Sequence, residues 1–281
     1  MHSDLWTPRK RIEKEYYRAV KKALTKLGSL LDGVDNPFEI IQRLHAATHD
    51  PWFKRYAEAT AMKMVTNVFS NAGRTWRQAA NKNSKGSKLH KALLQELGTP
   101  IGGAVNKEVQ RNAEYIRSVP ANVARDFTEH IANKSLAGMR SSDIAKDLQA
   151  LYPHVSDVKA NLIARTETSK THTALEQARS DYLGIKWYQW RTSEDARVRD
   201  SHRLMDHVLV AWDDPPSPEE LDGLRNVGHY HAGGIYNCRC APLGIIDLDE
   251  VTWPARVYRN GAIEPMTLKE FKRIWTPSDV S

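Results

Sequence analysis

The spacing of apolar residues changes at Gly184, and this change limits the folds open to the chain more than any other feature. Before Gly184, apolar residues recur every three or four positions, which is the period of an amphipathic helix. From Lys186 onward they alternate with polar residues, as expected of strands with one buried face. The sequence therefore predicts an α+β fold: a mainly helical N-terminal region, then a long helix and a small antiparallel sheet.

Proline and polar clusters divide the helical part into separate predicted segments. Asp50 and Pro51 mark a helix start, because Asp can cap exposed N–H groups and proline at the first helical position loses no hydrogen bond. Pro120 and Pro153 are expected to separate helices, and residues 81–87 read as a polar loop. The predicted helices span 9–31, about 40–44, 51–80, 88–97, 101–118, 120–134, 141–152 and 157–183.

The region after Gly184 is expected to hold the sheet. Gly138 separates the all-helical front from the rest of the chain, so three regions are predicted: a helical region over 1–135, a module over 136–250, and a C-terminal strand with a short helix over 251–281. The predicted strands span 186–191, 208–210, 237–243 and 253–259, and the predicted short helices span 200–205 and 267–275.

The chain has 281 residues but only two cysteines, Cys238 and Cys240. Because they are one residue apart, they cannot build a disulfide framework, and their use fits a reducing compartment or a pair of metal ligands. No apolar run approaches the roughly 20 residues that a bilayer requires, and the N-terminus has no apolar segment typical of a secretory signal. No membrane anchor is expected.

Charge is distributed unevenly around a net value of +7. Residues 1–31 carry eight Lys or Arg against three acidic residues, and 51–92 carry nine against one, whereas 194–222 carry three against nine. Such a basic face most often meets phosphate, which makes double-stranded DNA a candidate partner. The alternative is a solvated helix face. The candidate DNA contacts lie on the first predicted helix: Lys10, Lys14, Lys21, Lys22 and Lys26.

The two cysteines fall in a predicted strand, where residues two apart point to one face. Thiolates placed in this way are good zinc ligands, although the spacing is shorter than usual. His202 and His231 are the candidates for the other two positions of a tetrahedral structural zinc site. The alternative, weighed equally, is that Cys238 and Cys240 are small buried residues at the end of a core strand.

Three motifs succeed one another in the second half of the chain. They are Ala164–Thr168 (ARTET) on the long helix, Asp195–His202 (DARVRDSH) after a tryptophan-rich strand, and Asn237–Cys240 (NCRC). In this order they resemble the head-morphogenesis family of tailed bacteriophages, the Mu F-like minor head proteins. The resemblance covers about a third of the chain. Some relatives have a C-P-x-C sequence around Arg199–His202, where this chain keeps only His202.

The resemblance implies a minor head protein of the virion, located in the head interior or at the portal vertex and present in the host cytoplasm during assembly. It implies binding to the portal, with capsid or scaffold proteins as further partners, and a role in head assembly, DNA packaging or DNA ejection. Residues 165 and 167 are two apart and cannot face each other on a helix, so each needs its own partner. The motif residues that the resemblance marks are Arg165, Glu167, Asp195, Arg197 and Arg199; pairing with nearby acidic groups is favoured over a phosphate clamp for the last two.

Two other functions compete with this interpretation. A zinc-dependent nuclease would use the same four metal candidates, but the chain has no HNH, H-E-x-x-H or paired-carboxylate motif, so we expect no enzyme. A DNA-binding module without a virion role would rest on the basic N-terminal region alone. Aromatic side chains usually anchor protein contacts, and the expected portal anchors in the helical front are Trp52, Phe53, Tyr56 and Trp76.

Overall fold

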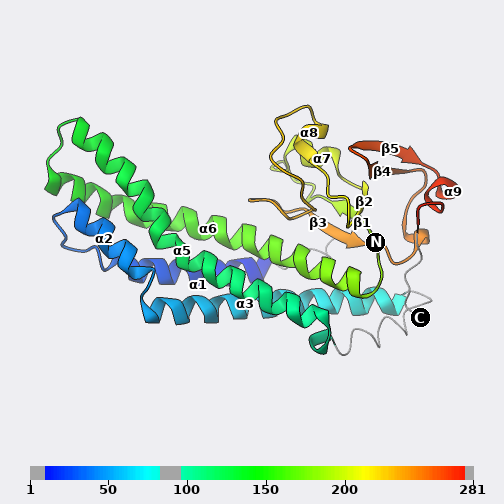
Figure 1. The fold of residues 1–281 in the computed structure, drawn as a ribbon, viewed down its shortest axis with the longest axis horizontal. Helices are drawn as coiled ribbons and strands as arrows, with labels where there is room; N and C mark the ends of the chain where they lie inside the picture. Colours follow the sequence, from blue (N-terminus) through cyan, green and yellow to red (C-terminus); the bar gives the residue numbers. More distant parts are fainter. Residues whose placement is uncertain (1–9, 83–95, 276–281) are drawn as a thin grey trace. The chain divides into compact units, whose positions relative to one another are not determined.

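The computed structural model describes residues 10–82 and 96–275 (Figure 1). It divides into two compact units. We call residues 10–65 with 107–165 the helical unit, and residues 66–82, 96–106 and 166–275 the sheet unit. These limits differ from the expected boundaries near 135 and 250, because three long helices each contribute residues to both units. The predicted loop over 81–87 and helix over 88–97 lie mostly outside the described residues.

The helical unit is built from amphipathic helices whose apolar sides are buried. In α1 (Lys10–Gly28), the buried positions Ile12, Tyr16, Val20, Ala23, Leu24 and Leu27 follow helical spacing. Two hydrogen bonds fix polar groups inside this core: Tyr16 Oη to Asn112 Oδ1 at 3.3 Å, and Tyr152 Oη to the Leu24 carbonyl at 2.9 Å. The other helices with residues in this unit are α2 (Pro37–Ala47), α3 (Pro51–Lys82), α5 (Pro100–Leu136) and α6 (Ser141–Tyr182).

Helix starts follow the capping rules that the sequence predicts. Asn36 Oδ1 accepts a hydrogen bond from the Phe38 amide at 2.9 Å, and Asp50 Oδ1 accepts one from the Phe53 amide at 2.8 Å. Each bond satisfies a backbone donor that the first helical turn leaves free. The predicted start at Asp50–Pro51 is therefore confirmed.

The expected helix breaks at Pro120 and Pro153 are wrong, because these prolines lie inside α5 and α6. Figure 1 shows α6 as one continuous helix. A proline inside a helix costs about 3 kcal/mol, but packing supplies most helix stability in a folded protein. Val119 and Val123 beside Pro120 are buried. Ser156, which directly precedes the predicted helix start at 157, lies within α6 and donates its hydroxyl to the Pro153 carbonyl at 2.9 Å.

The sheet unit contains a five-stranded sheet of order β3-β1-β2-β4-β5. The sheet is mixed and not antiparallel as expected, since β2 and β4 run parallel with Leu209 opposite Val257. Parallel neighbours require a long crossover, and residues 212–254 provide it. The strands are β1 (Trp187–Arg191), β2 (Leu209–Ala211), β3 (Ala241–Gly244), β4 (Ala255–Arg259) and β5 (Ala262–Met266).

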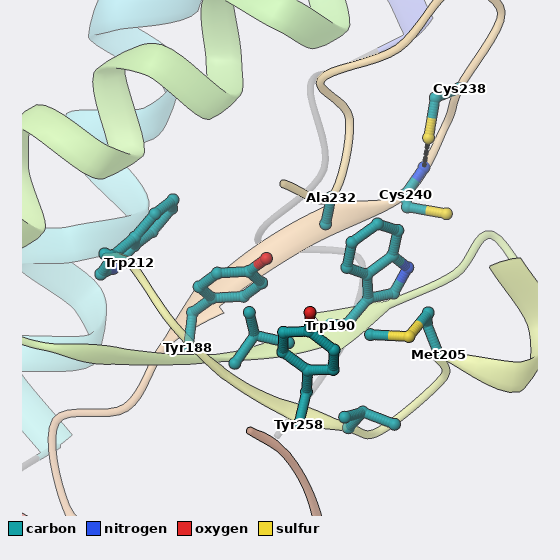
Figure 2. Packing of buried hydrophobic residues seen from close by; sticks show 10 residues of the cluster. Tyr188, Trp190, Met205, Trp212, Ala232, Cys238, Cys240 and Tyr258 are labelled. Atoms are coloured by element: carbon teal, nitrogen blue, oxygen red, sulfur yellow. Dashed lines mark hydrogen bonds between the residues drawn. The ribbon is translucent and has the colours of Figure 1, made fainter. Parts of the chain in front are cut away.

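The sheet buries a different cluster on each face, in agreement with strand alternation. Trp187 belongs to one cluster, with Val257 and Phe271. Tyr188 and Trp190 belong to the other, which also contains Met205, Val208, Val210, Trp212, Ala232, Cys238, Cys240 and Tyr258 (Figure 2). Three short helices and two 3-10 turns complete the unit: η2 (Glu96–Gly98), α7 (Asp200–Leu204), α8 (Pro218–Leu221), η3 (Leu248–Glu250) and α9 (Leu268–Phe271). Within the described parts of the chain, no helix has both the length and the apolar character needed to cross a bilayer.

Candidate metal centre

Three buried side chains converge on one point at the edge of the second cluster. Cys238 Sγ and Cys240 Sγ each lie 3.5 Å from Nδ1 of His202. The exposed fractions are 2% for His202, 2% for Cys238 and 4% for Cys240. Within the described residues, their donor atoms form a group in which all members lie within 4.8 Å of one another. Two sulfurs and one imidazole nitrogen are a donor set that binds zinc.

The sequence predicted that a strand positions the two cysteines, but in the structure they precede the strand. Strand β3 begins only at Ala241, and Asn237 has a left-handed backbone with φ of 55°. The chain therefore turns before the strand. In this turn the Cys240 amide donates to Cys238 Sγ at 3.4 Å, and the Asn237 amide donates to Thr166 Oγ1 at 3.0 Å. Both sulfurs still reach His202, but because of the turn and not because of strand alternation.

The second nitrogen of His202 contacts a polar pair on its other side. Tyr230 Oη lies 3.0 Å from His202 Nε2 and donates its proton to Glu219 Oε2 at 2.5 Å. The Tyr230 oxygen therefore accepts from Nε2–H, which leaves the Nδ1 lone pair facing both sulfurs. Glu219, at the start of α8, is buried and also accepts from Ser201 Oγ at 3.4 Å.

Neighbouring groups shift the pKa values of the two thiols in opposite directions. The hydrogen bond from the Cys240 thiol, together with the contact with His202, holds the pKa of Cys238 well below its usual value. The resulting interaction with Cys238, together with burial, raises the pKa of Cys240. Burial and the neighbouring Glu219 carboxylate raise the pKa of Tyr230, so this phenol keeps its proton.

His231, the fourth predicted ligand, does not join the cluster. Its Nδ1 lies 3.2 Å from Tyr188 Oη, and its ring packs edge-on against Tyr188 and Trp212. Burial lowers the pKa of His231 to about 4, so the ring is neutral near pH 7. The structure thus brings together three of the four predicted ligands, and His231 is a half-buried residue that packs against Tyr188 and Trp212.

The acidic residue of the second motif holds the cysteine segment in place. Arg239, between the two cysteines, forms a two-point ion pair with Asp195, in which Nη2 donates to Oδ1 at 2.6 Å. Asp195 also accepts from the Arg197 amide at 2.9 Å. The hydrogen bond from Arg239 is the main reason why the pKa of Asp195 is depressed. The sequence predicted that Arg197 and Arg199 would pair with nearby acidic residues. Asp195, one of these acidic residues, instead pairs mainly with Arg239.

The other motif residues occupy different places. Arg197 is exposed and approaches Asp195 only at 4.0 Å, whereas Arg199 Nη2 donates to the Tyr236 carbonyl at 3.0 Å and stacks over that ring. Arg165 pairs with Glu13 at 3.7 Å inside the helical unit. Glu167 is buried in the sheet unit.

The candidate DNA contacts differ in exposure. Lys10, Lys14 and Lys22 are exposed on α1. Lys21 forms an ion pair with Asp157, and Lys26 Nζ lies 3.5 Å from the centre of the Trp52 ring. Four of the five predicted lysines, Lys26 included, are exposed to solvent, and Lys21 is half-buried.

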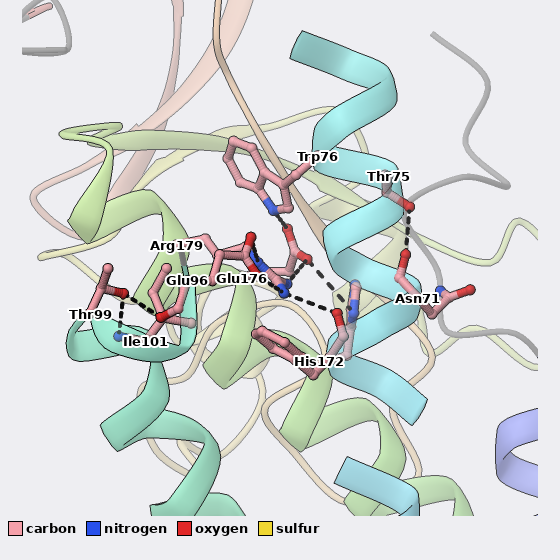
Figure 3. A network of polar contacts seen from close by, with 10 residues as sticks. Asn71, Thr75, Trp76, Glu96, Thr99, Ile101, His172, Glu176 and Arg179 are labelled. Atoms are coloured by element: carbon pink, nitrogen blue, oxygen red, sulfur yellow. Dashed lines mark hydrogen bonds and ion pairs between the residues drawn. The ribbon is translucent and has the colours of Figure 1, made fainter. Parts of the chain in front are cut away.

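A buried polar network in the sheet unit was not predicted from the sequence (Figure 3). Trp76 Nε1 donates to Glu176 Oε2 at 2.7 Å, and Arg179 Nη1 lies 3.7 Å from the same carboxylate. Burial raises the pKa of Glu176 to about 8. The signal was present in the sequence, because Glu176 and Arg179 are three apart and flanked by the apolar Leu175 and Ala178.

Comparison with known proteins finds a match to the segment that contains the candidate metal centre. Residues 125–243 match the family model described as phage Mu protein F like protein. An uncharacterized protein of Haemophilus influenzae is 30% identical over 146 residues, which are 52% of this chain and 30% of that protein. The chain thus spans less than a third of the length of this relative. No solved structure matches the present chain. The matched segment includes all three motifs, together with the buried cluster of His202, Cys238 and Cys240, and it is this segment of the chain that is similar to the phage Mu protein F-like family.

Proposed function

We propose that this chain is a non-enzymatic minor head protein that binds the portal of a phage procapsid and assists head assembly, DNA packaging or DNA ejection. The observation that carries the proposal is the family match over 125–243, since the family is one of phage head proteins. The motif residues Asp195, Arg239 and His202 serve as internal contacts of the fold. This arrangement supports a structural role for the matched segment.

The burial of the cluster argues against the nuclease alternative. A catalytic zinc must hold a water in an open position that the substrate can also reach. Cys238 and Cys240 are almost fully buried and belong to the apolar cluster that contains Trp190. A phosphodiester therefore has no direct route to an ion held by these sulfurs.

The expected portal anchors require revision. Phe53 and Trp76 are fully buried in the core and cannot contact a partner. Trp52 and Tyr56 stack on each other at 5.2 Å. On the helical unit, the large apolar side chains that do face solvent include Phe38 at 63% and Met62 at 58% exposure. We assign portal contact to this unit, because exposed aromatic and methionine side chains are enriched at protein interfaces.

The test is co-sedimentation with procapsids assembled from the capsid, scaffold and portal proteins of the same phage. The chain should sediment with portal-containing particles, and much less with particles assembled without portal. Phe38→Asp with Met62→Asp should weaken this association. Leu224→Asp, an equally exposed site on the sheet unit, is the matched control and should leave it unchanged. Equal binding to particles with and without portal would contradict the proposal.

DNA contact is a second candidate role, favoured by one observation. Lys10, Lys14 and Lys22 are exposed on α1. The same helix also contains the acidic residues Glu13 and Glu15. The phosphates of the DNA backbone attract exposed lysines without any contact to the bases. A protein placed at the portal would meet packaged DNA, so this role is compatible with the first.

A further inference from the structure

The separations between the three donor atoms match those of a tetrahedral zinc site. With Zn–S near 2.3 Å and Zn–N near 2.0 Å, the sulfur and nitrogen ligands of one tetrahedral ion lie roughly 3.5 Å apart. Cys238 Sγ and Cys240 Sγ lie 3.5 Å and 3.5 Å from His202 Nδ1. The atoms are therefore already spaced for one shared ion.

The surroundings of His202 are those of a metal-bound imidazole. Its Nδ1 faces the sulfurs, and its Nε2 donates toward Tyr230, which in turn donates to the buried carboxylate of Glu219. A ligating histidine nearly always gives its other N–H to such a partner, which fixes the tautomer and orients the ring. Without an ion, Nδ1 would have only two weakly polar thiols as partners in a buried site.

The charge of the site also suits a divalent cation. Two thiolates and one zinc ion sum to zero, so the complete site can sit beside the apolar Trp190 and Met205 without a net buried charge. Two thiolates without a cation would repel each other in the same place. The donor set, which has two sulfurs and no carboxylate, favours zinc over magnesium or calcium.

We propose that His202 Nδ1, Cys238 Sγ and Cys240 Sγ bind one zinc ion, with a small ligand such as water in the fourth position. The ion ties α7 to the turn before β3 and therefore links the second and third sequence motifs. Tyr230 and Glu219 are positioning residues that orient His202. This inference does not depend on portal binding, and it replaces the four-ligand set that included His231.

The first test is the metal content of the purified full chain. After zinc loading and dialysis, the wild type should hold about one zinc per chain. Cys238→Ser, Cys240→Ser and His202→Gln should each lose most of it. The matched control is His231→Gln, which changes a histidine outside the cluster and should retain the wild-type content. Glu219→Gln should bind zinc about 10–100-fold more weakly.

A second measurement uses only the wild type, in case a cysteine variant fails to fold. Cobalt(II) titrated into the metal-free chain should give thiolate-to-cobalt charge-transfer absorption and intense visible bands typical of four-coordination. Zinc added afterwards should displace it. A zinc content below about a tenth of an ion per chain after loading, or a cobalt spectrum without thiolate bands, would overturn the proposal. Retention of zinc by both serine variants would do the same.

Discussion

Arg179 donates hydrogen bonds to both carboxylate oxygens of Glu96, from Nε and Nη2 at 3.1 Å each, inside the sheet unit. Nη2 also donates to the Phe69 carbonyl at 3.0 Å, and the guanidinium stacks on the Phe69 ring. Both partners of the ion pair are almost fully buried. A single side chain of α6 thus fixes α3 and η2, which are distant in sequence (Figure 3).

Replacing Arg179 by methionine should strongly destabilise the fold. The substitution leaves the buried Glu96 carboxylate without its cation, which typically costs about 3–5 kcal/mol. The double variant Arg179→Met with Glu96→Gln should recover part of this loss, because no buried charge is then left unpaired. Urea denaturation measures the loss of unfolding free energy in both variants, provided that the slope of unfolding free energy against urea concentration is unchanged. A loss below about 1 kcal/mol for Arg179→Met would mean that water reaches this pair.

Glu176 should make stability depend on pH in the neutral range. Burial raises its pKa to about 8, from an ordinary value of 4.5. The native state therefore binds more protons than the unfolded state between these values, and the free energy of unfolding falls as pH rises from about 4.5 to 8.

The test of this effect is Glu176→Gln, which keeps an acceptor for Trp76 but cannot ionise. Its unfolding free energy relative to wild type should be higher at pH 8.5 than at pH 6, each by urea denaturation. Glu264→Gln, at an exposed position, is the control for simple charge removal. A relative stability of Glu176→Gln that does not change with pH would show that Arg179 keeps the carboxylate ionised.

Gly233 and Gly261 form a matched pair for testing the packing beside the candidate metal centre. Both have left-handed backbones, with φ of 83° and 82°. A Cβ at Gly261 would meet nothing within 4 Å, whereas one at Gly233 would lie 2.5 Å from Thr173 Oγ1 and 2.9 Å from the Cys240 carbonyl. Gly261→Ala should cost about 1–2 kcal/mol from backbone strain. Gly233→Ala should cost a further ~1–3 kcal/mol from overpacking, and equal losses would show that the Cys240 turn moves freely.

The exposed lysines of α1 should carry DNA affinity through counterion release. Changing Lys10, Lys14 and Lys22 to glutamine should lower affinity for duplex DNA at low salt. The slope of log affinity against log salt should fall by about 0.9 for each phosphate that the variant no longer neutralises. The matched control changes Lys269, Lys272 and Arg273, which are equally exposed on the sheet unit. If the control weakens binding as much, the charge effect is general and α1 has no special role.

Local signals predicted the elements well but did not predict how long helices continue. Capping residues and apolar spacing located α1, α2 and the start of α3, because these features act within one or two turns. Pro120 and Pro153 misled the prediction because burial of neighbours such as Val119 and Val123 is a tertiary effect. The hairpin of β4 and β5 was missed, although its turn residues Asn260 and Gly261, both with positive φ, form a known two-residue turn signal.

The candidate metal centre shows the same limit. The sequence identified Cys238, Cys240 and His202, because few residue types bind zinc. It could not separate His202 from His231, since only the fold shows which imidazole faces the sulfurs. Glu219 and Tyr230 were not predicted, because their role depends on an orientation that spacing does not encode. The parallel pairing of β2 and β4 was likewise hidden by the long connection over 212–254.

Portal binding by the helical unit is tested most directly by reconstructing a portal-containing procapsid with this chain bound. Exposed Phe38 and Met62 belong to the helical unit, whereas Asp195 and Arg239 form internal contacts of the sheet unit. The reconstruction should therefore show density for residues 10–65 and 107–165 in contact with the portal. Density for the sheet unit on the portal, with the helical unit making no contact there, would contradict the account.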